Sequence, residues 1–361
     1  MKQVLTLQTS QRLTMMGRLR MADWIEMPEK DFAKEIEKIE KDPLFRKLYF
    51  GDEKIPGAFR RQSWASGTLN SAFYEIDERT TPGSGDKVAI DKIVFARVAA
   101  VAAIRRLGRA GFERYFLKGE TLTLDEIGRL AGLSKEEVLA VHDLMLEIDV
   151  RSEFEVSEMA PATAPERPHS CLARLNIAEG EIHFEFYNPY WARGLYHIRY
   201  DLLDQWKTSF LSADERTRLS SLIKRMETVN LRQNSLFRII NLAAKLQIDY
   251  LSSHRNLDMR PISLRGLAQR LDLSPSTVSR ALSRRSVKLP WDEEAPLIAF
   301  VPGRRRVLRD SISLWLKESP SITDAELTAR LKSERGIVIS RRTVNAVRHE
   351  VKKMRNSTQS P

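Results

Sequence analysis

A helix-turn-helix pattern occurs three times in the 361-residue chain, and it limits the fold more than any other feature of the sequence. Residues 123–138 align without a gap on residues 263–278, and residues 323–344 form a third copy with a longer turn. Each copy starts with a Ser or Thr that can cap a helix, and Glu126 and Glu326 complete a capping box in two of them. A short helix, a turn and a second helix that opens with Ser follow each time. We therefore expect a mainly α, multi-domain helical protein.

The three copies differ at the start of their second helix. The first copy has Lys135-Glu136-Glu137 there, and its acidic residues would repel phosphate, which favours a structural or protein-binding role. The second copy has small hydroxyl residues and arginines, and the third has Arg341-Arg342. This pattern predicts two DNA-binding units and one scaffold unit. The alternative is three purely structural helical hairpins.

The third copy ends in the strongest candidate for a recognition helix. Val344, Val347 and Val351 have the spacing of one buried helical face, so the arginines near them fall on other faces. The first turns of a helix in the major groove usually face the bases, and arginine can donate two hydrogen bonds to guanine O6 and N7. An isolated arginine pair is also compatible with a solvated surface or with plain phosphate contacts.

The predicted DNA-contacting residues come from the third copy, the second copy and a separate arginine run. They are Arg341, Arg342, Thr343, Asn345, Arg348, Ser276, Thr277, Ser279, Arg280, Arg284, Arg304, Arg305 and Arg306.

The positive charge is confined to the C-terminal third. From Arg255 onward there are 22 Lys and Arg against 11 Asp and Glu, whereas the residues before it include 37 of each, so this third holds the whole net charge of +11. A basic third joined to a neutral remainder indicates a polyanion-binding end and a part with another task.

The remaining chain predicts helices with one β-hairpin. Helical patterns cover Glu29–Lys41, which we expect on a surface, 90–115 and 122–148, and a long helix is expected over 214–254. Alternating apolar residues predict a hairpin that turns near Glu179-Gly180. Residues 50–86 indicate a linker with little fixed structure, and residues 153–168 a loop.

Enzyme, cofactor and membrane classes find little support in the sequence. Cys171 is the single cysteine, the six histidines lack ligand spacing, and a phosphate-binding glycine loop is missing, so we expect no metal, no cofactor and no catalysis. Neither a leader peptide nor an apolar run of membrane-spanning length is evident, which predicts a cytoplasmic protein. A recombinase or nuclease would need clustered carboxylates or a nucleophile beside a base, and the carboxylates here are dispersed.

Three stretches resemble the sigma-54 family of RNA polymerase sigma factors, in the family's order. Residues 340–349, with Arg341-Arg342-Thr343-Val344, are similar to its ten-residue C-terminal box. Residues 261–288 resemble its promoter-binding helix-turn-helix, and residues 5–44 its N-terminal activator-responsive segment.

The resemblance implies five regions: an activator-responsive segment at 1–48, a linker at 49–87, a core RNA polymerase-binding domain at 88–206, a long helix with a DNA-binding helix-turn-helix at 207–302, and a promoter-recognition domain at 303–361. It implies a non-enzymatic initiation factor whose partners are promoter DNA, core RNA polymerase and an ATP-hydrolysing activator. Arg341 and Arg342 would bind the upstream GG element, and Ser276–Arg280 would lie near the downstream one.

A second hypothesis follows from a departure from the family. Its N-terminal segment is rich in Gln, whereas residues 17–24 here contain no Gln and carry charges. The alternative is a divergent regulator or repressor that occupies such promoters without activator-dependent initiation.

Overall fold

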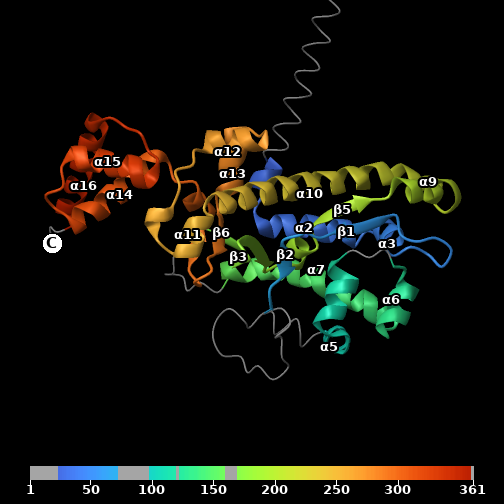
Figure 1. The fold of residues 1–361 in the computed structure, drawn as a ribbon. Helices are drawn as coiled ribbons and strands as arrows, with labels where there is room; N and C mark the ends of the chain where they lie inside the picture. The colour runs from blue at the N-terminus through green and yellow to red at the C-terminus, as the bar shows by residue number, and fades with distance from the viewer. Residues whose placement is uncertain (1–22, 72–96, 119–121, 159–168, 359–361) are drawn as a thin grey trace, which may run out of the picture. The chain divides into compact units, whose positions relative to one another are not determined.

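The structure, a computed structural model, describes residues 23–71, 97–118, 122–158 and 169–358. The described chain is mainly helical, as expected (Figure 1). It divides into two compact units. The first unit contains the described residues up to Ile240 together with Arg280–Leu297. The second contains Asn241–Ser279 together with the described residues from Ile298 onward. Among the described residues, no helix is both long and apolar enough to cross a membrane.

The helices up to residue 209 belong to the first unit and agree with most of the expected helical regions. Their bounds are α2 Glu29–Glu40, α3 Pro43–Phe50, α5 Val98–Phe112, α6 Leu124–Ala131, α7 Lys135–Glu158, α8 Pro189–Ala192 and α9 Tyr200–Ser209, with a π-helical turn η2 at Glu113–Leu117. Pro28 is the N-cap of α2. Helix α7 continues into the first residues of the expected loop.

The expected hairpin is present and belongs to a larger sheet. Strands β3 (Ser170–Ala178) and β4 (Glu181–Phe186) are antiparallel. Glu179 and Gly180 connect them with φ of 53° and 77°, the positive values that a two-residue hairpin turn requires. The sheet order is β2-β4-β3-β6-β7, with the additional strands β2 Gly67–Leu69, β6 Arg285–Lys288 and β7 Glu294–Pro296. These strands of three or four residues are too short to show alternation in the sequence.

The first half of the expected linker is ordered, so this prediction was wrong for residues 50–71. Strand β1 (Phe59–Gln62) pairs with β5 (Leu195–Ile198), and β2 pairs with β4. The glycines here serve close packing: a Cβ atom on Gly57 would lie 2.1 Å from the carbonyl oxygen of Tyr49. Residues 72–87 of the linker and residues 1–22 lie outside the described part of the chain.

Helix α2 has an exposed face, which includes Asp31 and Lys38 and confirms the surface prediction, but its opposite face lies in the core. Phe32, Ile36 and Ile39 are fully buried, and Glu29 and Glu40 at its ends are only 2% and 1% exposed. The many Lys and Glu residues suggested a solvated helix. The prediction was wrong for Glu29 and Glu40, because both have buried arginine partners from distant parts of the chain.

Glu40 is the centre of a buried charge network. Its Oε1 accepts a hydrogen bond from Arg61 Nε at 3.1 Å and another from the Tyr196 hydroxyl at 2.8 Å. Its Oε2 accepts one from Arg193 Nη1 at 2.6 Å and lies 3.1 Å from His142 Nε2. Burial by itself would raise the pKa of Glu40, but Arg193 and Arg61 hold that pKa well below its usual range. The carboxylate is therefore ionised and paired.

Glu29 joins the start of α2 to α10 and β6 in the same way. Its Oε1 accepts hydrogen bonds from Arg232 Nη2 at 2.8 Å and from Arg285 Nε at 2.7 Å, and its Oε2 accepts one from the Tyr190 hydroxyl at 2.6 Å. Both arginines also donate to the carbonyl oxygen of Met27. Residues just before α2 are thereby fixed within the first unit.

The stability of the first unit is expected to fall steeply in acid. Burial would raise the pKa of Glu29, but Arg232 and Arg285 outweigh it and lower the pKa from 4.5 to about 2. A folded-state pKa below the unfolded one contributes stability, on the order of 3 kcal/mol here, which is present above about pH 4.5 and is lost toward pH 2. Tryptophan fluorescence during urea unfolding at pH 5, 4, 3 and 2.5 measures this loss. A constant unfolding midpoint over that range would contradict it.

The expected long helix is present but ends eight residues earlier than predicted. Helix α10 spans Ala213–Leu246, and Gln247, with φ −107° and ψ 18°, separates it from α11 (Ile248–Ser253). The Gln247 side chain donates to the carbonyl oxygens of Arg260 and Phe300 at 2.9 Å and accepts from Arg260 N–H at 2.8 Å. The break has a tertiary cause, since residues 214–254 contain no Pro or Gly.

The remaining helices include a C-terminal three-helix domain. Their bounds are η3 Asn256–Asp258, α12 Leu264–Leu271, α13 Pro275–Leu282, η4 Leu297–Phe300, α14 Arg304–Glu318, α15 Asp324–Arg335 and α16 Arg341–Thr358. Helices α14, α15 and α16 share one apolar core, formed by Val307, Leu308, Ile312, Trp315, Leu316, Leu327, Leu331, Ile337, Val344, Val347 and Val351.

Candidate nucleic-acid interface

All three predicted helix-turn-helix copies are helix pairs in the structure. The pairs are α6–α7, α12–α13 and α15–α16. Thr123 and Thr323 form capping boxes with Glu126 and Glu326, and Ser263 accepts a hydrogen bond from the Gly266 amide. The first helices end at Gly132, Asp272 and Gly336, all in the left-handed conformation that terminates a helix. Local sequence therefore determines these pairs.

The first pair has an acidic surface. A groove of about 390 Å³ beside α6 is lined by Asp52, Glu53, Asp125 and Glu126, with fewer basic side chains. Lys135, at the start of α7, pairs with Asp125 at 2.7 Å. A phosphate backbone would meet mainly negative charge here, which favours the scaffold role for this copy.

The first turn of α16 presents its arginines to solvent. Arg341, Arg342 and Thr343 are exposed, whereas Val344 and Val347 are buried in the core of the three-helix domain. The Ser340 hydroxyl accepts a hydrogen bond from the Thr343 amide at 3.3 Å and so caps the helix. Burial of the valine face orients the helix, and the two guanidinium groups are held on its outer side.

Two helix starts in this domain combine arginines with a positive helix dipole. The first turns of α14 and α16 contain no acidic residue, although acidic residues are favoured there. Arg304–Arg306 open α14, and Arg341-Arg342 open α16. Clustered positive charge at a helix start opposes helix stability, but it suits binding of an anion such as DNA phosphate.

The arginines of α14 have intramolecular partners as well as exposed surface. Arg304 donates to the carbonyl oxygen of Val338 in the turn before α16. Val338 lies three residues before Arg341 in the sequence. Arg305 pairs with Glu350 at 2.9 Å and is 76% exposed, and Arg306 lies 3.8 Å from Asp310. Exposed ion pairs of this kind are weak, so phosphates can compete for these arginines.

A triple variant in which glutamine replaces Arg304, Arg305 and Arg306 is expected to bind DNA with a weaker salt dependence. Each lost phosphate contact lowers the slope of log K against log[salt] by about 0.9, which gives at most about 2.7 for three. Sequence preference and folding stability should stay the same. The measurement is fluorescence anisotropy between 50 and 200 mM salt. Arg330→Gln is the matched control, because Arg330 pairs with Glu334 and with Glu318, which lies at the opposite end of α14 from Arg304–Arg306. Its slope should equal that of the parent.

Asn345 and Arg348, both predicted to contact DNA, lie on α16 but face α15. Asn345 Nδ2 donates to Asp324 Oδ2 at 2.7 Å, and Arg348 Nη1 donates to Asp324 Oδ1 at 2.8 Å. Asp324 was not among the predicted site residues. The only signal was an acidic residue at the first position of α15, which is ordinary at a helix start.

The predicted residues of the second pair lie at the start and end of α13. Ser276 and Ser279 are exposed and Thr277 is half-buried. Arg280 Nε lies 3.6 Å from Glu26 Oε2, and its side chain is 41% exposed. Arg284 follows the helix, exposed and with φ of 57°. The small hydroxyl residues at the helix start leave room for a close approach of a DNA backbone.

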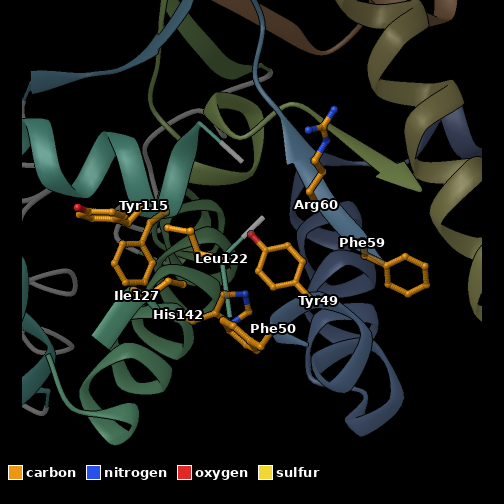
Figure 2. A pocket seen from close by; sticks show the side chains of 9 residues that line it. Tyr49, Phe50, Phe59, Arg60, Tyr115, Leu122, Ile127 and His142 are labelled. Atoms are coloured by element: carbon orange, nitrogen blue, oxygen red, sulfur yellow. The ribbon is translucent and has the colours of Figure 1, made fainter. Parts of the chain in front are cut away.

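A small cavity in the first unit is lined mainly by aromatic side chains (Figure 2). Tyr49 and Phe50 of α3 lie beside His142 of α7, with Tyr115 and Ile127 on the other side. The cavity volume is about 10 Å³, which is space for about one water molecule. Neither ring nitrogen of His142 makes a well-directed hydrogen bond, although Nε2 is close to Glu40. The cavity is too small for an organic cofactor.

Comparison with known proteins gives a family match and likenesses to solved structures. Residues 212–295 match the family model for "Sigma-54, DNA binding domain". The crystal structure of Aquifex aeolicus sigmaN bound to promoter DNA is similar with a TM-score of 0.34 and 17% sequence identity, over 63% of this chain and 85% of that chain. None of the curated proteins matches. The family match includes α12 and α13 with Ser276–Arg280 and Arg284, whereas α14 to α16 lie outside it.

Proposed function

We propose that this chain, which carries a sigma-54-type DNA-binding domain, is a transcription initiation factor that binds core RNA polymerase and directs it to promoter DNA. The family match over residues 212–295 carries the proposal. It is supported by Arg341 and Arg342, which are exposed at the start of α16, because a guanidinium group in that position can donate two hydrogen bonds to a guanine. The chain itself would perform no hydrolysis.

The roles of the parts follow the order of the chain. Helix α13, with Ser276–Arg280 and Arg284, would bind one promoter element, and the start of α16 would bind guanines in a second. Residues 88–206 would bind core RNA polymerase. The N-terminal segment, residues 1–48, would respond to an ATP-hydrolysing activator before the DNA opens.

Transcription in vitro tests the whole proposal. Purified chain, core RNA polymerase, a promoter with upstream GG and downstream GC elements, and an activator ATPase with ATP should give open complexes, detected by permanganate footprinting. Omission of the ATPase should abolish them. The Arg341→Ala/Arg342→Ala variant should still co-purify with core polymerase but should lose promoter binding. Failure of the chain to bind polymerase would overturn the proposal.

The second candidate is a regulator or repressor that occupies these promoters without activator-dependent initiation. The Gln-free stretch 17–24 favours it, because the family's activator-responsive segment is rich in Gln. In the same assay this candidate predicts promoter binding without polymerase binding or open complexes.

A further inference from the structure

Asp324 makes a clamp between the two helices of the third helix-turn-helix. It is the first residue of α15, and its two carboxylate oxygens accept hydrogen bonds from two residues of α16, Asn345 at 2.7 Å and Arg348 at 2.8 Å. The Arg348 side chain is 18% exposed and that of Asp324 is 25% exposed, whereas Arg341 and Arg342 are open to solvent. Helix α16 therefore carries one arginine that is paired with Asp324, Arg348, and two that are exposed to solvent, Arg341 and Arg342.

The carboxylate is not required to cap α15. Thr323 and Glu326 already form the capping box, since Glu326 N–H donates to Thr323 Oγ1 at 3.3 Å and Thr323 N–H donates to Glu326 Oε2 at 2.7 Å. Both oxygens of Asp324 are thus directed to α16. The hydrogen bonds from Asn345 and Arg348 lower the pKa of Asp324, so it stays ionised at neutral pH.

A carboxylate and a phosphate compete for the same guanidinium group, because both accept charge-assisted hydrogen bonds from it. While Asp324 holds Arg348, that arginine is partly withdrawn from a DNA backbone. A phosphate contact by Arg348 would add affinity for every sequence equally and would lower the ratio of specific to non-specific binding.

We propose that Asp324 is a positioning residue for DNA specificity: it holds Arg348 and Asn345 against α15, so that α16 meets DNA through Arg341 and Arg342. This inference rests on the proposed function, because specificity here means preference for promoter DNA over unrelated DNA. It assigns Arg348 and Asn345 to the support of the recognition helix instead of to contact with DNA.

The test compares Asp324→Ala, Arg348→Ala and the double variant in the full chain, on a guanine-containing promoter duplex and on an unrelated duplex. Asp324→Ala should steepen the salt slope on the unrelated duplex by about 0.9 for one phosphate gained. It should then lose about threefold more affinity than the parent between 50 and 200 mM salt. The promoter-to-unrelated affinity ratio should fall. Arg348→Ala alone should leave the slope unchanged, and the double variant should return to the parent slope.

An unchanged slope and ratio in Asp324→Ala would overturn the proposal, as would a loss of promoter affinity in Arg348→Ala as large as in Arg342→Ala. The slope on the unrelated duplex does not depend on promoter recognition, so it tests the clamp even if the proposed function fails. If circular dichroism shows that Asp324→Ala is not folded, the Asp324→Asn variant takes its place in the salt-slope measurement. It keeps an accepting oxygen without the charge, and its slope should change in the same direction by a smaller amount.

Discussion

Replacing Arg342 with alanine is expected to weaken binding to a guanine-containing promoter site by about 1–3 kcal/mol, an increase in Kd of about 5- to 150-fold. The Arg342 side chain is exposed in the first turn of a helix whose opposite face is buried by Val344 and Val347. From this position a guanidinium group can donate to guanine O6 and N7 together. Competition anisotropy with duplexes that differ at single guanines measures both the affinity and the preference for guanine.

Two further variants separate base recognition from charge. Arg342→Lys keeps the positive charge but replaces the rigid planar guanidinium with a flexible ammonium group, so it should retain the salt slope and weaken discrimination between bases. Lys352→Ala removes an exposed charge from a later turn of the same helix and should leave discrimination unchanged. If Arg342→Ala weakened binding to all sequences equally, Arg342 would be a phosphate contact and its assigned role would be wrong.

Replacing Glu40 with alanine is expected to destabilise the first unit by about 3–5 kcal/mol. The substitution leaves the guanidinium groups of Arg61 and Arg193, which are 0% and 1% exposed, without the carboxylate that both of them contact. An uncompensated buried charge costs more than the loss of its hydrogen bonds alone. Glu40→Gln keeps the shape and one acceptor and should cost less than alanine.

The measurement must report on the first unit alone, because two compact units need not unfold together. Trp315 is the only tryptophan in the second unit, so a Trp315→Phe background confines the fluorescence signal to the first unit, with Trp24, Trp64, Trp191, Trp206 and Trp291. Glu37→Ala is the matched control on the same helix. Glu37 pairs only with Lys41 among the ion pairs found in the described chain, and its loss should cost less than about 1 kcal/mol. Equal costs for both variants would contradict the role of Glu40.

Local interactions explain what could be predicted from the sequence. Helix caps such as Thr123 with Glu126, and the turn at Glu179 and Gly180, depend on residues within a few positions of each other. The valine spacing in α16 likewise defines which face is buried, and it therefore indicated exposed arginines without knowledge of the fold. For this reason the three helix pairs and the central hairpin were predicted, as was the exposure of Arg341 and Arg342.

Only the tertiary structure decided which charged residues have buried partners. Glu40 meets Arg61 and Arg193 across 21 and 153 positions of sequence, and Asp324 meets Arg348 across 24. The same contacts buried both ends of α2 and turned the Arg348 side chain of α16 toward α15. Periodicity gives each residue's direction on its own helix, but the residue that it faces depends on the path of the whole chain. A glutamate or arginine has the same local pattern whether it is solvated or paired in a core, and only the partner distinguishes the two.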